Sequence, residues 1–232
     1  MMKLSKADKR SRNFSNADSD LRMKKDIILL LSMAVLSLKS LSVFSQDNND
    51  LYLQIIETDN YGEECAYVNS VGEEIIPFGK YLRCYTDTFK TVAFVTKKGD
   101  DRIVAIDRNE KELFQVKTYD NGPDYVKDGL FRIVVNDKIG FANMKGEIII
   151  PPTFKTVYPF SEERAAFCID CRQIESGEHL VDTGGKWGYI DTKGEVAIPA
   201  QYDMAYSFKA GKATVKLGNE KFYVDKNGNR IP

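Results

Sequence analysis

The sequence has little of the residues on which enzymes and metal sites often depend. Its 232 residues include one histidine, one tryptophan and four cysteines. A single histidine, His179, offers no basis for a Ser-His-Asp or Cys-His catalytic centre, and we expect it to be solvated in a polar loop. Gly184-Gly185 lacks the spacing of a P-loop or dinucleotide motif. We therefore assign no catalytic, cofactor-binding or metal-ligating residues, and we expect the protein not to be an enzyme.

A strong charge of either sign is also missing. The formal net charge of the whole chain is −1, and the segment from Gln46 onward holds 24 basic and 30 acidic residues, a net charge of −6. No basic stripe remains in that segment, which argues against nucleic-acid binding. The modest acidity favours solubility more than the choice of a particular partner.

Residues 1–45 differ in composition from the rest of the chain. Met23-Lys24-Lys25 precedes a 12-residue apolar run, Ile27–Leu38, and a short serine-rich stretch then leads to Val43-Phe44-Ser45. This order is typical of a secretory signal peptide cleaved after Ser45, and the run is short for a membrane span. We expect translation to start at Met23, after a polar extension, and the domain at 46–232 to be secreted or periplasmic, with no stable membrane span after cleavage. An uncleaved anchor is the alternative.

A short pattern recurs five times after residue 50. Its clearest copy is Lys186–Pro199, a hydrophobic strand, a turn, a second strand and a proline. The turn at its centre, Asp191–Gly194, recurs at four other places: Asn69–Gly72, Asp107–Glu110, Asn143–Gly146 and Asp225–Gly228. Self-similarity at such a period is typical of repeat architectures.

The residue types in this turn predict its geometry. Asp or Asn at the first position and Gly at the fourth favour a type I turn followed by a residue with positive φ. Glu110 replaces the glycine in the second copy, and we expect that hairpin to be looser or to have a different loop.

The segments between the turns predict the fold class. With a further apolar strand in each copy, such as Ala213–Leu217, every repeat contributes about three strands, and no segment has helical periodicity. The predicted fold is therefore all-β, about five tandem three-stranded repeats in an open array. A closed, propeller-like ring is the alternative, because it would remove the exposed edges. The longest turn-to-turn step, from Gly146 to Gly194, predicts an insertion at about 171–185 that loops out on one face.

Cys168 and Cys171 lie at the start of this insertion, and three interpretations are open. The favoured one is a local disulfide, since an even number of cysteines in an exported chain permits bridges. The others are reduced, packed thiols and a redox or metal role. Cys65 occupies the position of Trp187 and belongs in the core, where a bridge to Cys84 is possible.

Aromatic residues recur at matching places of two repeats. Either they fill the space between adjacent repeats, which we favour because repeats cannot bury their apolar faces alone, or they form an open face that binds a peptide or a sugar. They are Phe154, Tyr158, Phe160, Tyr202, Tyr206 and Phe208.

The segment from Lys186 through Tyr202 to Val215 resembles the WG-containing repeat family of bacterial β-repeat proteins, named for a Trp-Gly pair like Trp187-Gly188. Residues 138–160 resemble it with Ile139 in place of the tryptophan, and the copies at Cys65 and Lys221 lack both residues. The resemblance implies a β-repeat array in an exported or envelope-associated bacterial protein. It carries no shared catalytic residues.

Together these patterns favour a non-enzymatic, extracytoplasmic module that binds a protein or a glycan. An envelope-acting hydrolase with unidentified carboxylates is the first alternative, and a purely structural spacer is the second. Adjacent acids such as Glu162-Glu163 are expected to be surface charges, because neighbours on a strand point to opposite faces.

Overall fold

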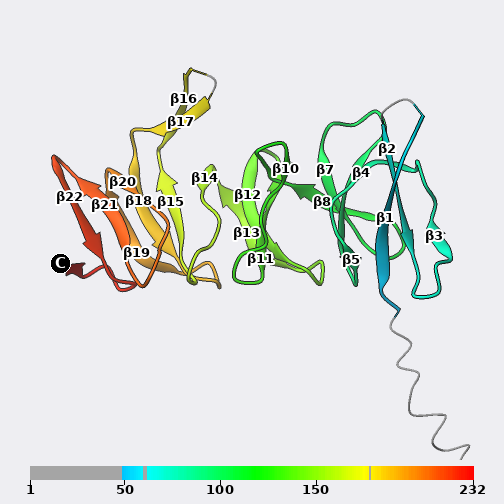
Figure 1. Cartoon of the computed structure of the whole chain (residues 1–232). Helices are drawn as coiled ribbons and strands as arrows, with labels where there is room; N and C mark the ends of the chain where they lie inside the picture. Colours follow the sequence, from blue (N-terminus) through cyan, green and yellow to red (C-terminus); the bar gives the residue numbers. More distant parts are fainter. Residues whose placement is uncertain (1–48, 60–61, 178) are drawn as a thin grey trace, which may run out of the picture. The chain divides into compact units, whose positions relative to one another are not determined.

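The structure is a computed structural model that describes residues 49–59, 62–177 and 179–232 (Figure 1). The predicted signal peptide and the polar extension before it lie outside these residues. The described residues belong to one unit, Asn49–Pro232, and consist of antiparallel strands and their connections. Within them no helix is long and apolar enough to cross a membrane. The predicted all-β fold class is confirmed.

Five repeats follow one another in chain order, and each contains three main strands. These strands are β1 (Leu51–Glu57), β2 (Glu63–Val68) and β3 (Glu74–Ile76); β6 (Ala93–Lys97), β7 (Ile103–Ile106) and β8 (Glu112–Val116); β11 (Leu130–Val135), β12 (Lys138–Asn143) and β13 (Ile148–Phe154); β15 (Ala165–Ile169), β18 (Lys186–Ile190) and β19 (Val196–Tyr202); and β21 (Ala213–Leu217), β22 (Glu220–Val224) and β23 (Arg230–Ile231). The remaining strands are β4 (Tyr81–Cys84), β5 (Thr88–Phe89), β9 (Thr118–Tyr119), β10 (Gly122–Pro123), β14 (Thr156–Val157), β16 (Arg172–Ser176), β17 (His179–Thr183) and β20 (Met204–Ala205).

The array is open. The larger sheets have the orders β3-β2-β1-β5, β13-β12-β11-β8-β7-β6-β4, β14-β15-β18-β19 and β20-β21-β22-β23. Within the described residues neither β22 nor β23 pairs with β1, and Figure 1 shows β1 and β22 at opposite ends of the repeat array. The prediction of an open array is confirmed, and the closed ring is not formed.

The predicted turn is present in every repeat. In the fourth repeat Gly194 donates its backbone N–H to the carbonyl of Asp191 at 2.9 Å, and the Asp191 carboxylate accepts the N–H groups of Lys193 and Glu195. Gly194 has φ +85°, a conformation that glycine adopts without a Cβ clash. This hydrogen-bond pattern confirms the turn predicted from the Asx and Gly positions.

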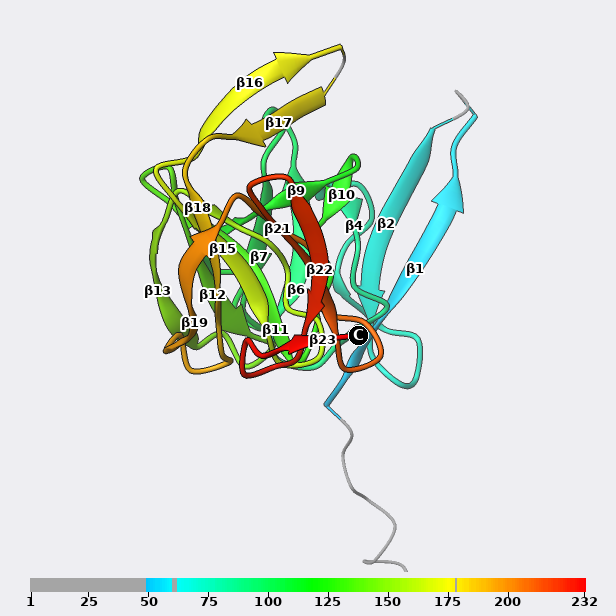
Figure 2. The same ribbon diagram turned by 90° about the vertical axis from the view of Figure 1, so that its left-hand side faces the viewer.

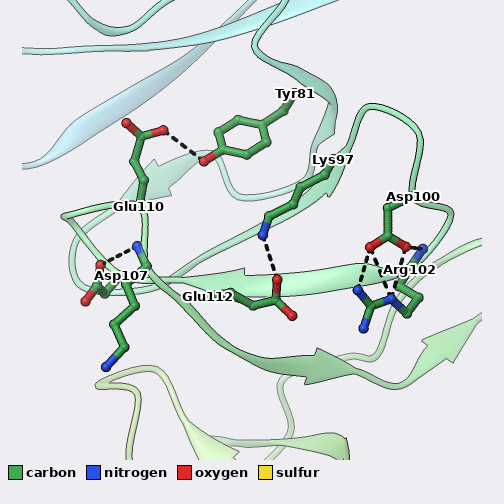
Figure 3. Close-up of polar contacts among 8 residues, drawn as sticks. Tyr81, Lys97, Asp100, Arg102, Asp107, Glu110 and Glu112 are labelled. Carbon is green, nitrogen blue, oxygen red and sulfur yellow. Dashed lines mark hydrogen bonds and ion pairs between the residues drawn. The ribbon is translucent and has the colours of Figure 1, made fainter.

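The second repeat shows where one expectation was wrong. Glu110 has φ +61° and donates its N–H to the carbonyl of Asp107 at 2.9 Å, so the hairpin keeps the turn of the other four repeats. The Glu110 carboxylate accepts a hydrogen bond from the Tyr81 hydroxyl at 2.8 Å (Figure 3). It accepts another from the Lys80 ammonium at 2.7 Å. These two contacts hold the side chain in place and offset the strain of a non-glycine residue in this conformation.

Three of the four junctions between consecutive repeats bury the same aromatic contact. The aromatic residue two positions before the turn packs against a phenylalanine of the next repeat, with ring centroids 4.7–5.3 Å apart. The pairs are Tyr67–Phe89, Phe141–Phe160 and Tyr189–Phe208. The first ring of each pair is at most 1% exposed, and each pair lies in an apolar cluster that spans its own junction.

On one side of each repeat, the side chains of paired strand residues pack against the next repeat in the chain. We call this side the forward face. In the fourth repeat it carries Ala166, Cys168, Trp187 and Tyr189, which are paired across β15 and β18 and buried against the fifth repeat. The corresponding residues of the third repeat are Arg132, Val134, Ile139 and Phe141. Most of these side chains are apolar, which explains why isolated repeats could not bury them.

The recurrent aromatics are mainly core residues, as we favoured. Phe160, Phe208 and Tyr202 are buried, whereas Phe154 and Tyr158 are half-buried. Tyr206 is the exception, with 45% of its surface exposed.

Candidate functional site

The insertion of the fourth repeat forms a β-hairpin. Strands β16 and β17 pair antiparallel from Arg172 opposite Thr183 to Ser176 opposite His179. Both views show the hairpin projecting beyond the strands of the repeat from which it comes (Figures 1 and 2). His179, expected in a loop, is therefore the first residue of a strand.

The base of the hairpin is held by a covalent bridge. Cys168 and Cys171 are joined by a disulfide, with their Cα atoms 5.8 Å apart. Opposite the bridge, Gly185 has φ +66°, and a Cβ there would lie 2.6 Å from the backbone nitrogen of Cys171. The two chain segments therefore cross so closely that only glycine fits. Among the described residues, no group of three or more His, Cys, Asp or Glu side chains could hold a metal ion.

Two hollows of about 260 and 360 Å³ meet beneath the hairpin, and Tyr158 and Asp182 border both. Asp182 reaches from β17 to accept a hydrogen bond from the Thr156 hydroxyl at 3.2 Å. Burial, followed by the nearby Asp182 carboxylate, raises the pKa of Tyr158. The phenol therefore remains a neutral hydrogen-bond donor at physiological pH.

The smaller hollow is polar. Its lining includes Lys117, Lys155, Asp137 and Gln173, together with the buried Arg132. Cationic and carboxylate side chains are both present. This part of the groove therefore suits the polar and backbone groups of a peptide better than a ligand whose charges all have the same sign.

Arg132 belongs to an ion pair that sequence reasoning missed. Its guanidinium donates to Asp124 through Nη2 at 2.6 Å and Nε at 3.0 Å, and its Nη1 donates to the carbonyl of Val157 in the next repeat at 3.1 Å. The side chains of Arg132 and Asp124 are 7% and 0% exposed. The sequence feature that could have predicted this ion pair is the presence of an arginine within the apolar strand Leu130–Val135.

Apart from Asp182, the larger hollow is lined by aromatic and aliphatic side chains. Trp187 lies in its wall and packs against Tyr158 with ring centroids 4.9 Å apart. Val181, Met204 and Tyr206, which are 39–45% exposed, complete the lining with Ala205. The groove therefore combines a polar end with an apolar end.

The hairpin also carries apolar side chains and open edges. Ile174 and Val181 face each other across β16 and β17 and are 49% and 43% exposed. Within the described residues the two strands pair only with each other, so both outer edges offer free backbone groups. Unpaired strand edges are sites at which an extended segment can add by backbone hydrogen bonding.

Related hollows lie beside the equivalent tyrosines of other repeats. Tyr85, Tyr158 and Tyr206 each donate a backbone N–H to the same position of the neighbouring strand. Tyr85 borders a hollow of about 720 Å³ with exposed Ile55 and Leu82, next to a second disulfide, Cys65–Cys84. The hairpin distinguishes the groove at Tyr158 from this one.

Comparison with known families agrees with this geometry. Residues 139–170 and 187–220 match the family model described as WG containing repeat. Two segments of the chain are thus similar to the WG repeat. No curated protein and no solved structure matches the chain.

The Trp-Gly pair of the WG repeat has a structural explanation. Trp187 is 3% exposed and fills the forward face, while Gly188 lies where β19 bulges over β18. A Cβ on Gly188 would lie 2.7 Å from the backbone nitrogen of Ala200. Gly140 has the same place beneath the bulge of β13. The two segments that match the WG model are thus the ones with this bulge.

The carboxylate pair Glu162-Glu163 contributes to the packing of repeats. Glu162 accepts the backbone N–H groups of Ala210 and Gly211 from the next repeat at 2.6 and 2.8 Å. Glu163 donates its own N–H to Asp128 of the preceding repeat at 2.8 Å. Both residues therefore link adjacent repeats.

Proposed function

We propose that this protein is an exported, non-enzymatic binding module whose WG repeats hold hairpin β16–β17 in position for a partner protein. The partner would contribute an extended segment that lies along the hairpin edge and enters the groove beneath it. A binding role that depends on a rigid β-scaffold agrees with the repeat architecture.

The exposed pair of Ile174 and Val181 on an open-edged hairpin supports this proposal best. A two-stranded hairpin is marginally stable alone, and exposing two facing aliphatic residues on it adds no stability to the repeats. Both features are useful if a partner covers them, because backbone pairing supplies affinity and the flanking pockets supply specificity.

Export is supported by the disulfides and by the pattern at the N-terminus. Cys65–Cys84 and Cys168–Cys171 are bridges of a kind that persists in oxidising compartments. N-terminal sequencing of protein recovered outside the cytoplasm should give a first residue near Gln46. A start at Met1 or Met23 in that material would contradict cleavage after Ser45.

The binding proposal can be tested with matched variants. Ile174→Ser/Val181→Ser should abolish capture of the partner from an envelope fraction, whereas Ile148→Ser/Val196→Ser, which removes similarly exposed aliphatic residues elsewhere, should retain it. In the complex, backbone amides of residues 172–183 should exchange hydrogen more slowly. Equal capture by both variants would contradict a hairpin site.

Three further outcomes separate the alternatives. Binding of a purified neutral glycan that is lost only in the hairpin variant would replace the protein partner by a glycan. Turnover of a cell-wall or polysaccharide substrate by the wild type would contradict a non-enzymatic role. Failure to bind any envelope component would favour a structural spacer.

A further inference from the structure

The forward face of the last repeat differs in chemistry from all the others. Register places Thr214, Lys216, Lys221 and Tyr223 where the fourth repeat has Ala166, Cys168, Trp187 and Tyr189. Among the described residues nothing covers this face: Tyr223 is 40% exposed, whereas Tyr189 at the same position is fully buried. The face therefore presents lysine and tyrosine side chains at its surface.

This end face contains a groove of about 420 Å³. Its lining includes three lysines, Lys209, Lys212 and Lys221, and two tyrosines, Tyr206 and Tyr223. The Lys212 ammonium lies 4.3 Å from the Tyr223 ring centroid, and that of Lys221 lies 5.3 Å from the Tyr206 centroid. These cation–π contacts order the lysines beside the rings.

The groove is positively charged in a protein with a slight negative net charge. No acidic side chain lines it, and within the described residues Lys209, Lys212 and Lys221 form no ion pair with a carboxylate. Ser207 and Thr214 add hydroxyl groups to the lining. A terminal repeat needs only a polar outer face for solubility. Solubility alone does not require two half-exposed tyrosines among three lysines.

We propose that the end face of the fifth repeat binds an acidic polysaccharide. Carboxylates on successive sugars would pair with the three lysines, and the apolar face of a sugar ring would lie against Tyr206 or Tyr223. The hydroxyl groups of Ser207 and Thr214 would bond to the sugar hydroxyls. The chemistry selects a polyanion that also has apolar ring faces and many hydroxyl groups.

Three other occupants fit the face less well. A further repeat, or a second copy of the chain, would bury Lys216 and Lys221 in an apolar junction without partners, which is costly. Nucleic acid prefers an extended basic surface, and this patch is confined to one end of an acidic protein.

The test uses the purified protein with polygalacturonate as the probe and dextran as the neutral control. Polygalacturonate should bind and dextran should not, and binding should weaken as salt is added. Lys212→Gln/Lys221→Gln should lower the affinity about tenfold, and Tyr223→Ser should also lower it. Lys145→Gln/Lys193→Gln removes the same charge from exposed turns of other repeats and should leave the affinity unchanged.

The results distinguish a specific site from a general charge effect. Equal losses in the two double variants, or displacement of polygalacturonate by single-stranded DNA at equal charge concentration, would overturn the proposal. So would failure of polygalacturonate to bind. The end-face groove shares Tyr206 with the hollow beneath the hairpin but contains neither Ile174 nor Val181. Ile174→Ser/Val181→Ser should therefore bind polygalacturonate like the wild type, which distinguishes this result from the protein-binding proposal.

Discussion

The Tyr81 hydroxyl donates a 2.8 Å hydrogen bond to Glu110, a residue that occupies a turn position held by glycine in the other four repeats. The two residues are 29 positions apart in the chain. A long-range contact thus allows a left-handed conformation that local sequence disfavours.

Replacing Glu110 should separate the hydrogen bonds from the backbone strain. Glu110→Ala loses the contacts with Tyr81 and Lys80 but keeps the strain, and should lower the free energy of unfolding by about 1–3 kcal/mol. Glu110→Gly loses the same contacts but relieves the strain, so it should be about 1 kcal/mol more stable than the alanine variant. Urea unfolding measures the stability of each variant. Equal stability of Glu110→Ala and Glu110→Gly would contradict the presence of backbone strain at this positive φ.

Two tyrosines at equivalent positions should respond differently to loss of their hydroxyl groups. Tyr189 donates to the carbonyl of Tyr206 at 2.7 Å, so Tyr189→Phe should cost about 1 kcal/mol. Thr86 is the neighbour of the buried Tyr67 hydroxyl, but the two do not have ordinary hydrogen-bond geometry. Among the described residues, the Tyr67 hydroxyl therefore has no hydrogen-bond partner. Tyr67→Phe should therefore be neutral or stabilising in thermal unfolding, and a loss as large as that of Tyr189→Phe would contradict this assignment.

Alkaline pH should destabilise the fold through its buried tyrosines. Burial raises the pKa of Tyr67 from 10.0 to about 12, and burial also raises the pKa values of Tyr81 and Tyr189. As pH rises, the unfolded chain loses its tyrosine hydroxyl protons before the folded protein does. The contribution of these tyrosines to stability is therefore complete below pH 10 and is lost as pH rises through their folded-state pKa values. For Tyr67 the loss is on the order of 2–3 kcal/mol. Urea unfolding between about pH 9 and 12 should show the decline, and Tyr67→Phe should make it shallower.

Gly188 should tolerate no side chain. Gly188→Ala places a methyl group against the backbone of the β19 bulge and should cost about 1–3 kcal/mol. Gly122→Ala is the matched control, because its Cβ would meet only the Tyr119 carbonyl oxygen at an ordinary 3.7 Å. Equal melting temperatures of wild type and Gly188→Ala would contradict the close approach.

Both disulfides should be detectable by mass. The intact protein should be lighter by four hydrogens than its reduced form, and thiol alkylation should label cysteines only after reduction. A deficit of two hydrogens would leave one bridge unformed, and peptide mapping would then identify which pair is reduced.

The sequence predicted those parts of the fold that depend on local chemistry. Asx and Gly at fixed positions predicted the turns, and the recurring aromatics, including Phe160 and Phe208, predicted buried contacts between repeats. Glu110 was misjudged because its partners come from the preceding repeat. A residue's neighbours along the chain carry no information about such contacts.

The candidate groove was only partly predictable. The spacing from Gly146 to Gly194 indicated the insertion, but not that Ile174 would pair with Val181 in a projecting hairpin. The pairing of Arg132 with Asp124 depends on the excursion through β9 and β10, which returns Asp124 to the strand that holds the arginine. Such a return is set by tertiary packing.

The Arg132–Asp124 pair also bears on how similar repeats find their correct neighbours while the chain folds. A junction between apolar faces accepts many partners, and arrays of like units are prone to misassembly. Arg132 completes its bonds only when the carbonyl of Val157 is delivered by the fourth repeat. A mispaired neighbour that excluded water without supplying that acceptor would leave one guanidinium N–H of Arg132 without a hydrogen bond, at a cost of about 1–3 kcal/mol. This buried polar contact can thereby act as a checkpoint on the pairing of the third repeat with the fourth.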